Sequence, residues 1–598
     1  MKGGQLIWLL AAVALAQVGS ANTFFVSSSN GDDANSGTSA EAPLQSIQAL
    51  NNMEFTPGDS ILFHAGESWQ GMFWLHGSGT PELPIVVGKY GEGPRPIIDG
   101  NGYQASLLIY NDECIAVQDL EFINDASHLD EVGEVKKLEG FGGESNDWGS
   151  GKNVRFGIKV VADAQSIQRI QFADLYIHDV FPSPDLASNE HKGYGIKIET
   201  QSDLEQNAVH LANDVSFSDL TVSRTGHYGI WIKSLGLIQN DTFKNHNVVM
   251  DSCLFEYTGG SGFVPNKCEF VTVQNSIFNH TGSDVDERMW KRGSGMWTFD
   301  CRNVIAQFNQ FKNAHGPIDS YGAHIDFGNE NVLYQNNLSY NNEGGFVEIL
   351  GDNINCGYRY SLSINDGYRV DPNGVHNGRT LNISDYCGET NPGCSSAGTF
   401  VYNNTIYIGD TLAPEIRIKP GIGEFYCYNN LFICSPQGEA LHCDISEEAN
   451  FIDFSHNLFF DSSRYQFDAS GLVLNESLFE DPMLQAMDSL GGSHPDDYKL
   501  TAGSSAFQVG LNVAEVLLST VLFDHSAMTD FYGNAVSVIE TSIGAHQPAE
   551  GSFYCGLGAQ WNDAEQKCMA CLCDGDFDGD GNLTVTDLLI FITNFGAN

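Results

Sequence analysis

The side chains best suited to chemistry lie in short strings that each begin with glycine. Two of these strings, GAHID and GFVE, end in Asp326 and Glu348. Alternate residues of a strand point to opposite faces, so aligning the second string on Gly344 places Asp326 and Glu348 side by side. Two adjacent carboxylates cannot both ionise easily, which keeps one protonated beside an ionised partner. A glycosidase needs that pair, and Asp319 is a nearby acid that could replace either member.

Other interpretations of this region stay open. Clustered carboxylates also suit a calcium ion, so Asp326 and Glu348 could hold a metal in the groove. His324 and His227 follow turns near the same strings and could shuttle protons, although a structural hydrogen bond is the alternative for each.

Outward-facing positions of the glycine-headed strings form a ladder of aromatic and basic residues. Trp231 and Trp297 stand among charged neighbours, which favours a linear groove that binds sugar rings over a merely decorated sheet. Basic residues gather on the ladder and in the inserted loop SDVDERMWKRGSG. They are Lys159, Lys197, Lys233, Lys267, Arg288, Lys291 and Arg292, with Arg369 closing the far end. They indicate recognition of an anionic glycan, or internal ion pairs with acids such as Glu199 and Asp286.

The C-terminal segment carries a second kind of site. DFDGDGNLTVTD follows calcium-loop spacing, with oxygen ligands at positions 1, 3 and 5, glycine at 6 and an acid at 12. The predicted ligands are Asp576, Asp578, Asp580, Asn582 and Asp587. The motif resembles one half of a dockerin. That resemblance implies a cohesin-like or cell-surface partner, and a calcium-stiffened terminal module is the alternative.

Internal repeats indicate the elements that must position these residues. Strings such as VTVQNSIFNHTG and VLYQNNLSYNNEGG recur, and aligning their turns places six polar residues in equivalent positions. These are Asp219, Ser252, Asn275, Asn309, Asn337 and Ser361. A minimum spacing near 23 residues is what a coil of three short strands requires, and stacked asparagines can form a hydrogen-bonded ladder. We therefore predict an all-β parallel β-helix solenoid.

The ends of the repeat resemble those of a known superfamily. TFFVSSSNGDDANSGTSAEAPLQSIQALN followed by PGDSILFHAG is similar to the start of right-handed β-helix proteins of the pectate-lyase-like superfamily, in which a helix, here around Leu44 to Asn51, caps the first coil. HPDDYKLTAGSSAFQVG resembles their closing segment. The resemblance implies the fold from about residue 22 to 547. It leaves the reaction open, because this fold hosts lyases, hydrolases, epimerases and adhesins.

Bulk properties complete the prediction. The apolar run before Gly19-Ser20-Ala21 predicts a signal peptide over 1–21, and hence an exported protein, with no other stretch long enough to span a membrane. The formal net charge of -48 disfavours nucleic acid and anionic membrane. The 14 cysteines suit an oxidising compartment, and we expect disulfides within local groups such as Cys387/Cys394 and Cys427/Cys434/Cys443. A cysteine-containing linker over 548–573 precedes the calcium module at 574–598.

Three functions follow. The leading hypothesis is a monomeric glycoside hydrolase acting on an anionic extracellular polysaccharide, with Asp326, Glu348, His324 and Asp319 as candidate catalytic residues. The central strings resemble β-helix hydrolases, including fucan-degrading ones, more than pectate lyases. The second is a calcium-dependent polysaccharide lyase, whose superfamily resemblance implies Lys233 or Lys291 as the base. The third is a non-catalytic glycan-binding or adhesive β-helix.

Overall fold

The computed structural model describes most of the chain from residue 21 onward. The described residues are 21–127, 136, 153–184, 192–238, 242–419, 421–435, 437–445, 451–467, 473–485, 494–501, 503–517, 525, 529–537, 541–548, 559–562 and 567–570. The predicted signal peptide before residue 21 and the predicted calcium module at 574–598 lie outside them.

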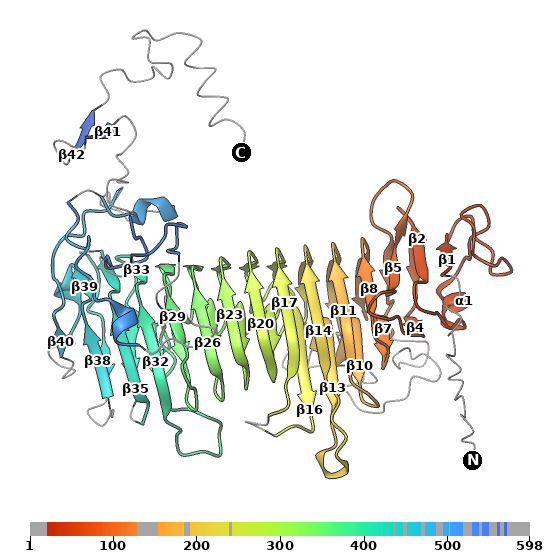
Figure 1. Ribbon diagram of the computed structural model, residues 1–598, viewed down its shortest axis with the longest axis horizontal. Coiled ribbons are helices and arrows are strands. Elements are labelled where there is room, and N and C mark those ends of the chain that lie inside the picture. Colours follow the sequence, from red (N-terminus) through yellow and green to blue (C-terminus); the bar gives the residue numbers. More distant parts are fainter. Residues whose placement is uncertain are drawn as a thin grey trace, which may run out of the picture.

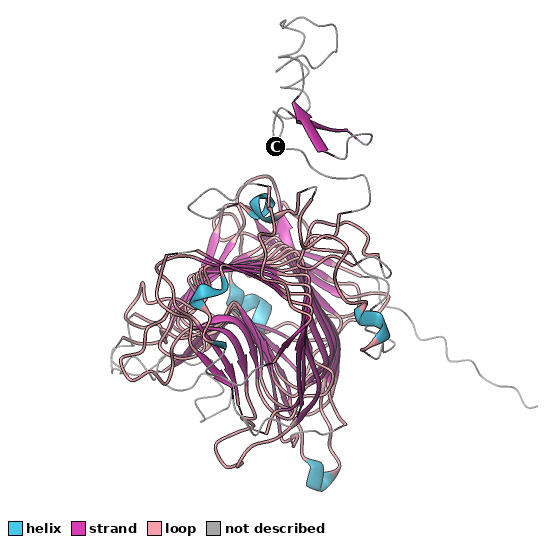
Figure 2. Cartoon of the chain, turned by 90° about the vertical axis from the view of Figure 1, so that its left-hand side faces the viewer, coloured by secondary structure: helices cyan, strands magenta, loops and turns pink. Residues whose placement is uncertain are grey.

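The chain forms a right-handed parallel β-helix, as predicted from the repeats. Successive coils stack along one axis from the N-terminal to the C-terminal end (Figure 1), and the view down that axis shows strands enclosing a common interior (Figure 2). Each coil contributes strands to three parallel sheets of 15, 13 and 12 described strands, here called sheets I, II and III. No described helix is long and apolar enough to cross a membrane.

The strands of each sheet are as follows. Sheet I contains β1 (Thr23–Val26), β2 (Ser60–His64), β5 (Ile85–Tyr90), β8 (Ile115–Gln118), β11 (Ile167–Ala173), β14 (Ala212–Ser218), β17 (Asn245–Asp251), β20 (Cys268–Gln274), β23 (Arg302–Gln307), β26 (Glu330–Gln335), β29 (Gly357–Arg359), β32 (Ser396–Tyr402), β35 (Gly423–Tyr428), β38 (Phe451–Ser455) and β40 (Leu474–Asn475). Sheet II contains β3 (Ser68–Gln70), β6 (Ile97–Asp99), β9 (Glu121–Asp125), β12 (Tyr176–Phe181), β15 (Thr221–Thr225), β18 (Leu254–Glu256), β21 (Ile277–Asn279), β24 (Gln310–Lys312), β27 (Leu338–Tyr340), β30 (Leu362–Ile364), β33 (Thr405–Ile408), β36 (Leu431–Cys434) and β39 (Leu458–Phe460). Sheet III contains β4 (Phe73–Leu75), β7 (Ala105–Tyr110), β10 (Val154–Ala162), β13 (Lys192–Gln201), β16 (Ile230–Leu235), β19 (Phe263–Pro265), β22 (Met296–Thr298), β25 (Ala323–Ile325), β28 (Gly345–Ile349), β31 (Arg379–Ile383), β34 (Glu415–Ile418) and β37 (Cys443–Ile445).

Few other elements are described. Helix α1 (Ile47–Asn51) caps the first coil, as expected, and Ser46 begins it by accepting a hydrogen bond from the Ala49 N–H. A hairpin near the C-terminus pairs β41 with β42, and four short 3₁₀ helices are present. Their bounds are β41 Ala559–Asn562, β42 Lys567–Ala570, η3 Leu204–Gln206, η4 Ser462–Arg464, η6 Pro495–Tyr498 and η7 Val513–Glu515.

The strand pattern of sheet III matches the predicted alternation. On β16, Ile230 and Ile232 are buried in the apolar interior, whereas Trp231 and Lys233 face outward and are half-buried. In-register pairing repeats this pattern on neighbouring coils, so Lys197 lies beside Trp231 and Glu199 beside Lys233. The outward residues of sheet III therefore form columns along the axis.

The predicted asparagine ladder is present, but half of its predicted members were misaligned by one residue. Asp219, Ser252 and Asn275 occupy a left-handed turn position, and the buried residues that follow them are Leu220, Cys253 and Ser276, of which only Ser276 belongs to the ladder. Each member's backbone N–H donates to the side-chain oxygen of the next, at 2.8–3.2 Å. The ladder is Ser276, Asn309, Asn337, Ser361, Asn404, Asn430 and Asn457. The two positions are adjacent, and in coils such as those of Asn275/Ser276 and Asn336/Asn337 both are polar, so turn alignment alone could not separate them.

The cysteines agree with the expectation only in part. Cys387 and Cys394 form a disulfide. The expected disulfide within the Cys427, Cys434 and Cys443 group is wrong, because all three are buried thiols. They lie on β35, β36 and β37, the three strands of one coil, each in a different sheet. Cys555, Cys571 and Cys573 lie outside the described residues.

Candidate active site

A cavity of about 800 Å³ opens over the C-terminal half of sheet III. Its floor includes outward residues of consecutive strands, Trp297 on β22, His324 on β25 and Glu348 on β28, together with Arg417 on β34. Segments that join the strands, containing residues 290–293, 318–321, 369–376 and 386–389, complete the lining. Asp319, Asp326 and Glu348 all line this one space, as the sequence predicted.

Asp326 follows β25 directly, where its N–H donates to the Thr298 carbonyl at 3.1 Å. The only hydrogen bond described for its carboxylate comes from the N–H of Phe327, at 2.9 Å. Burial raises the pKa of Asp326 to about 8, and the negative charges of Asp319 and Glu348 add to the effect. Asp326 is therefore a protonated carboxylic acid at neutral pH.

Asp319 has a different set of partners, chief among them Arg292. Its carboxylate Oδ2 accepts from Arg292 Nε at 2.8 Å and lies 2.7 Å from Nη2 of the same guanidinium. Arg369 donates to the backbone oxygen of Asp319 at 3.0 Å, and Asp319 and Ser320 both adopt left-handed φ values, of 57° and 66°. The guanidinium and the carboxylate form a charge-assisted ion pair, and the left-handed φ values are those of a turn, as at many other turns of this solenoid.

Glu348 lines the cavity, but the predicted alignment on Gly344 is wrong. Ile325 pairs with Ile349, which places Glu348 beside His324 rather than beside Asp326. The Glu348 Oε2 lies 3.9 Å from His324 Nδ1, and its Oε1 accepts from Asn382 Nδ2 at 2.8 Å. Burial raises the pKa of Glu348 to about 7, and Asp319 contributes to the rise.

Neither predicted histidine is placed to carry a proton as a cation. His324 is buried, its ring stacks on Trp297 at 5.6 Å and Ser294 Oγ lies 2.9 Å from its Nδ1. Burial lowers the pKa of His324 to about 4 and that of His227 well below its usual value. His227 is 1% exposed and packs against Trp290 at 3.7 Å, so it supports the cavity wall and does not reach a substrate.

Aromatic rings extend from the cavity toward the N-terminal coils. Trp297 donates from Nε1 to Ser261 Oγ at 3.0 Å and lines the cavity with Trp290 and Tyr228. Trp231 lies just outside it, edge-on to Tyr228 at 5.3 Å. The predicted aromatic ladder thus exists, with Trp297 in the cavity and Trp231 beyond it.

The basic residues are mostly paired with acids. Lys159 and Lys197, at 0% and 1% exposure, both contact Glu199, at 3.5 and 2.6 Å. The expectation that these two lysines bind substrate is therefore wrong, because their side chains are buried and do not reach the surface of sheet III.

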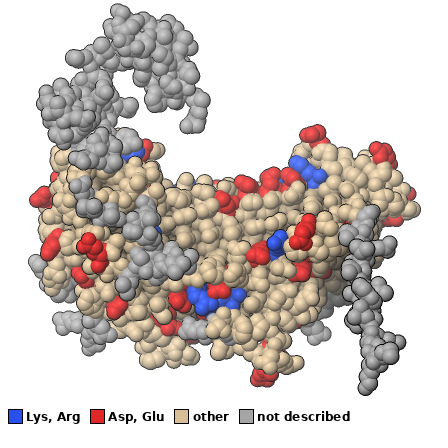
Figure 3. All heavy atoms as spheres, in the orientation of Figure 1, with Lys and Arg blue, Asp and Glu red and all other residues tan. Residues whose placement is uncertain are grey.

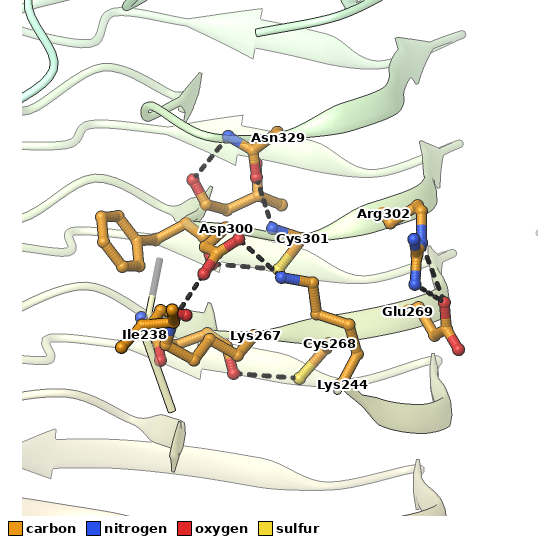
Figure 4. Close-up of polar contacts among 12 residues, drawn as sticks. Ile238, Lys244, Lys267, Cys268, Glu269, Asp300, Cys301, Arg302 and Asn329 are labelled. Atoms are coloured by element: carbon orange, nitrogen blue, oxygen red, sulfur yellow. Dashed lines mark hydrogen bonds and ion pairs between the residues drawn. The ribbon is translucent and has the colours of Figure 1, made fainter. Parts of the chain in front are cut away.

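Two more of the predicted basic residues, Lys267 and Arg288, are also held in ion pairs within the protein. Figure 4 shows Lys267 and Lys244 converging on the buried Asp300, and Arg288 contacts Asp125 and Asp286. Figure 3 likewise shows lysine and arginine next to acidic residues on the face drawn. These contacts support the ion-pair alternative.

The remaining predicted positions divide into two groups. Arg292 and Arg369 line the cavity, whereas Lys233 and Lys291 are not among the described residues that do. Lys233 instead lies over the Trp231 ring, at 4.9 Å. Within the described part of the chain, no cluster of three or more His, Cys, Asp or Glu is arranged to hold a metal ion. The predicted calcium ligands lie outside that part.

Sequence reasoning missed several lining residues, including Trp290, Phe327, Tyr386, Glu389 and Arg379. Two signals were available. Trp290 stands beside Arg292 in the inserted loop already singled out, and Tyr386 directly precedes the cysteine of a short disulfide loop.

No family model matches the chain. It is 22% identical over 609 residues to a lacto-N-biosidase from Bifidobacterium longum subsp. longum, an alignment covering 86% of this chain but only 36% of that protein. The solved GH136 lacto-N-biosidase from Eubacterium ramulus is 21% identical with a TM-score of 0.49, covering 77% of this chain and 68% of the other. Pectate lyase Pel9A is 13% identical with a TM-score of 0.39, covering 89% and 97%.

Proposed function

We propose that the chain is a glycoside hydrolase in which Asp326 is the general acid and Asp319 its ionised partner. One observation carries the proposal: Asp326, whose pKa burial raises, and Asp319, which Arg292 holds in an ion pair, line one cavity with Trp290, Trp297 and Tyr228. A buried carboxylic acid that shares a cleft with a second carboxylate is the pair that glycoside hydrolysis uses. The similarity to a lacto-N-biosidase supports the same reaction class.

The proposed reaction uses Asp326 as the proton donor and the Asp319 carboxylate as its partner. Asp326 donates its proton to the glycosidic oxygen as the bond to the anomeric carbon breaks. The Asp319 carboxylate either attacks that carbon or takes a proton from the attacking water, depending on its separation from Asp326. Arg292 donates to the Asp319 carboxylate and orients it, and Glu348 is the alternative partner because it lines the same space.

Lacto-N-biosides are the first substrates to test, given the name of the matched relative. The sequence-based preference for an anionic glycan stays a prediction. Arg292 and Arg379 at the cavity contact Asp319 and Glu415, and Arg417 contacts Asp444. An anionic substrate would therefore compete with existing ion pairs.

The test is a screen of the purified chain against lacto-N-biosides and neutral, uronate-containing and sulfated polysaccharides, with calcium and with chelator. A hydrolase generates new reducing ends without the ultraviolet absorbance of an unsaturated product. Absorbance that grows with a uronate substrate and requires calcium would establish the lyase alternative. Binding without any cleavage would establish the adhesive alternative.

We also propose, from sequence alone, that the protein is exported and that Asp576, Asp578, Asp580, Asn582 and Asp587 bind calcium and support a cohesin-like or cell-surface contact. Calorimetric titration of the full chain with calcium should lose one site in an Asp576→Ala/Asp580→Ala variant. An unchanged titration would exclude this loop as a calcium site.

A further inference from the structure

We propose that Tyr386 and Phe327 form the binding site for the leaving-group sugar at the rim of the cavity. The inference rests on the proposed hydrolase function and adds where the acceptor part of the substrate lies. The ligand is the apolar face of a pyranose ring on the leaving-group side of the scissile bond.

The two rings form an exposed aromatic surface at the cavity. Tyr386 is 45% exposed and lines the cavity beside Phe327. The two rings meet edge to face, with centroids 5.9 Å apart, and Phe327 meets Phe299 in the same way at 4.8 Å. Phe299 therefore packs against Phe327, and Tyr386 presents aromatic surface to the cavity. An exposed aromatic ring at a pocket mouth is typical of a site for the apolar side of a ligand.

The position of these rings relative to the acid decides which sugar they would bind. Phe327 directly follows Asp326 and donates its N–H to Oδ1 of that carboxyl group at 2.9 Å. Tyr386 is next to the acid through its edge-to-face contact with the Phe327 ring. A general acid protonates the oxygen of the leaving group. A sugar stacked beside Asp326 on this rim is therefore the leaving sugar.

The segment that carries Tyr386 is fixed before any ligand arrives. The Cys387–Cys394 disulfide closes the loop immediately after Tyr386. The Gly351 N–H donates to the Tyr386 carbonyl at 2.8 Å, and the Cys394 N–H donates to the Asp385 carbonyl at 2.8 Å. Because the ring is already held at the cavity, little conformational freedom is lost when a sugar binds.

The test compares two substrates that share a glycosyl group and differ in the leaving group. One is a lacto-N-bioside with a sugar as its aglycone, and the other is lacto-N-biosyl fluoride, which offers no ring to stack. For Tyr386→Ala we expect kcat/KM to fall about tenfold on the first substrate and to stay within about twofold on the fluoride. Tyr386→Trp should retain activity on both. Tyr426→Ala, which removes a half-buried tyrosine of sheet I that contacts Phe451, is the matched control.

The outcomes separate this inference from the proposed function. Wild-type cleavage of both substrates with equal losses in Tyr386→Ala, or with no loss, would overturn the inference and leave the hydrolase intact. If the wild type cleaves neither substrate, the hydrolase proposal fails for this substrate, and the inference is tested by binding to a glycan array instead. The Asp326→Asn variant should then bind a glycan on the array more strongly than the double variant Asp326→Asn/Tyr386→Ala, which lacks the tyrosine ring. Equal signals, or no binding at all, would overturn the inference as well.

Discussion

At the scale of single residues, the environment of Asp326 determines how activity should depend on pH. Asp326 must be protonated to act as the acid, and its pKa is about 8. We therefore expect kcat/KM to fall as the pH rises through about 8. Measuring kcat/KM as a function of pH for the wild type and for the Glu348→Gln variant checks this. If Glu348, with a pKa of about 7, were the acid instead, the fall would occur near 7 and disappear in that variant.

The same burial should lower stability at alkaline pH. The pKa of Asp326 is raised above its unfolded value, so its stabilising contribution is complete below about pH 4 and is lost as the pH rises toward 8. Asp326→Asn carries no ionisable group there. As the pH rises from about 4 to about 8, we expect the Asp326→Asn variant to become more stable relative to the wild type, by roughly 2 to 5 kcal/mol in the free energy of unfolding. Denaturant titrations at several pH values measure this, and a pH-independent difference would contradict it.

The sequence indicated which acids gather at the site but not how they pair. Gly344 and Gly345 are adjacent, and either could head the string, so the column of Glu348 rested on an arbitrary alignment. The hydrogen-bond register pairs Gly345 with Tyr321, so neither glycine aligns with Gly322 and Glu348 lies beside His324. Likewise, the ion pair between Asp319 and Arg292 and the burial that raises the pKa of Asp326 are both set by tertiary structure.

At the scale of elements, the asparagine ladder should account for measurable stability. Asn430 accepts from the Asn404 N–H at 3.1 Å and donates to the Val401 carbonyl at 2.9 Å, in the buried interior. Asn430→Ala leaves buried polar groups unpaired, so we expect a loss of about 1–3 kcal/mol. Chemical denaturation checks this against Asn373→Ala, an exposed asparagine. Equal midpoints for the two variants would show that the ladder is energetically neutral.

The disulfide loop should affect catalysis more than stability. Cys387→Ser/Cys394→Ser removes the covalent closure behind Tyr386 while leaving the β-helix core unchanged. Because the loop without its disulfide must be ordered when the substrate binds, we expect a several-fold rise in KM for a glycoside with a sugar leaving group, and a smaller change for the fluoride. Steady-state kinetics on both substrates measure this. An unchanged KM on the glycoside would argue against a role for the loop in binding.

Strands were easier to predict than the segments between them. The alternation on β16 and the repeated turn asparagines are periodic, so the β-helix followed from the sequence. The segments carrying Trp290 and Tyr386 have no period, and their convergence on sheet III depends on coil stacking. The buried Lys159, Lys197 and Glu199 cluster shows the limit of the pattern, because facing outward from a strand does not ensure contact with solvent.

At the scale of the whole molecule, the β-helix provides a long surface on which only part is equipped for chemistry. The cavity lies over β22, β25, β28 and β34, where consecutive coils supply its floor. Toward the N-terminal coils, the outward face of sheet III carries Lys159 and Lys197, both of which form ion pairs with Glu199. A few adjacent coils therefore carry the proposed catalytic residues, and the other coils of the solenoid hold these coils in register.

The most direct measurement is kcat/KM of Asp326→Asn against wild type on a lacto-N-bioside, with Asp366→Asn as the matched control. Asp366 is also buried, with a pKa raised to about 6, but it hydrogen-bonds to Asn342 and Ser363 away from the cavity. We expect Asp326→Asn to lose about a thousandfold or more and Asp366→Asn to stay within a few-fold while both remain folded. Near-wild-type activity in Asp326→Asn would contradict the assignment of the acid and the proposed mechanism with it.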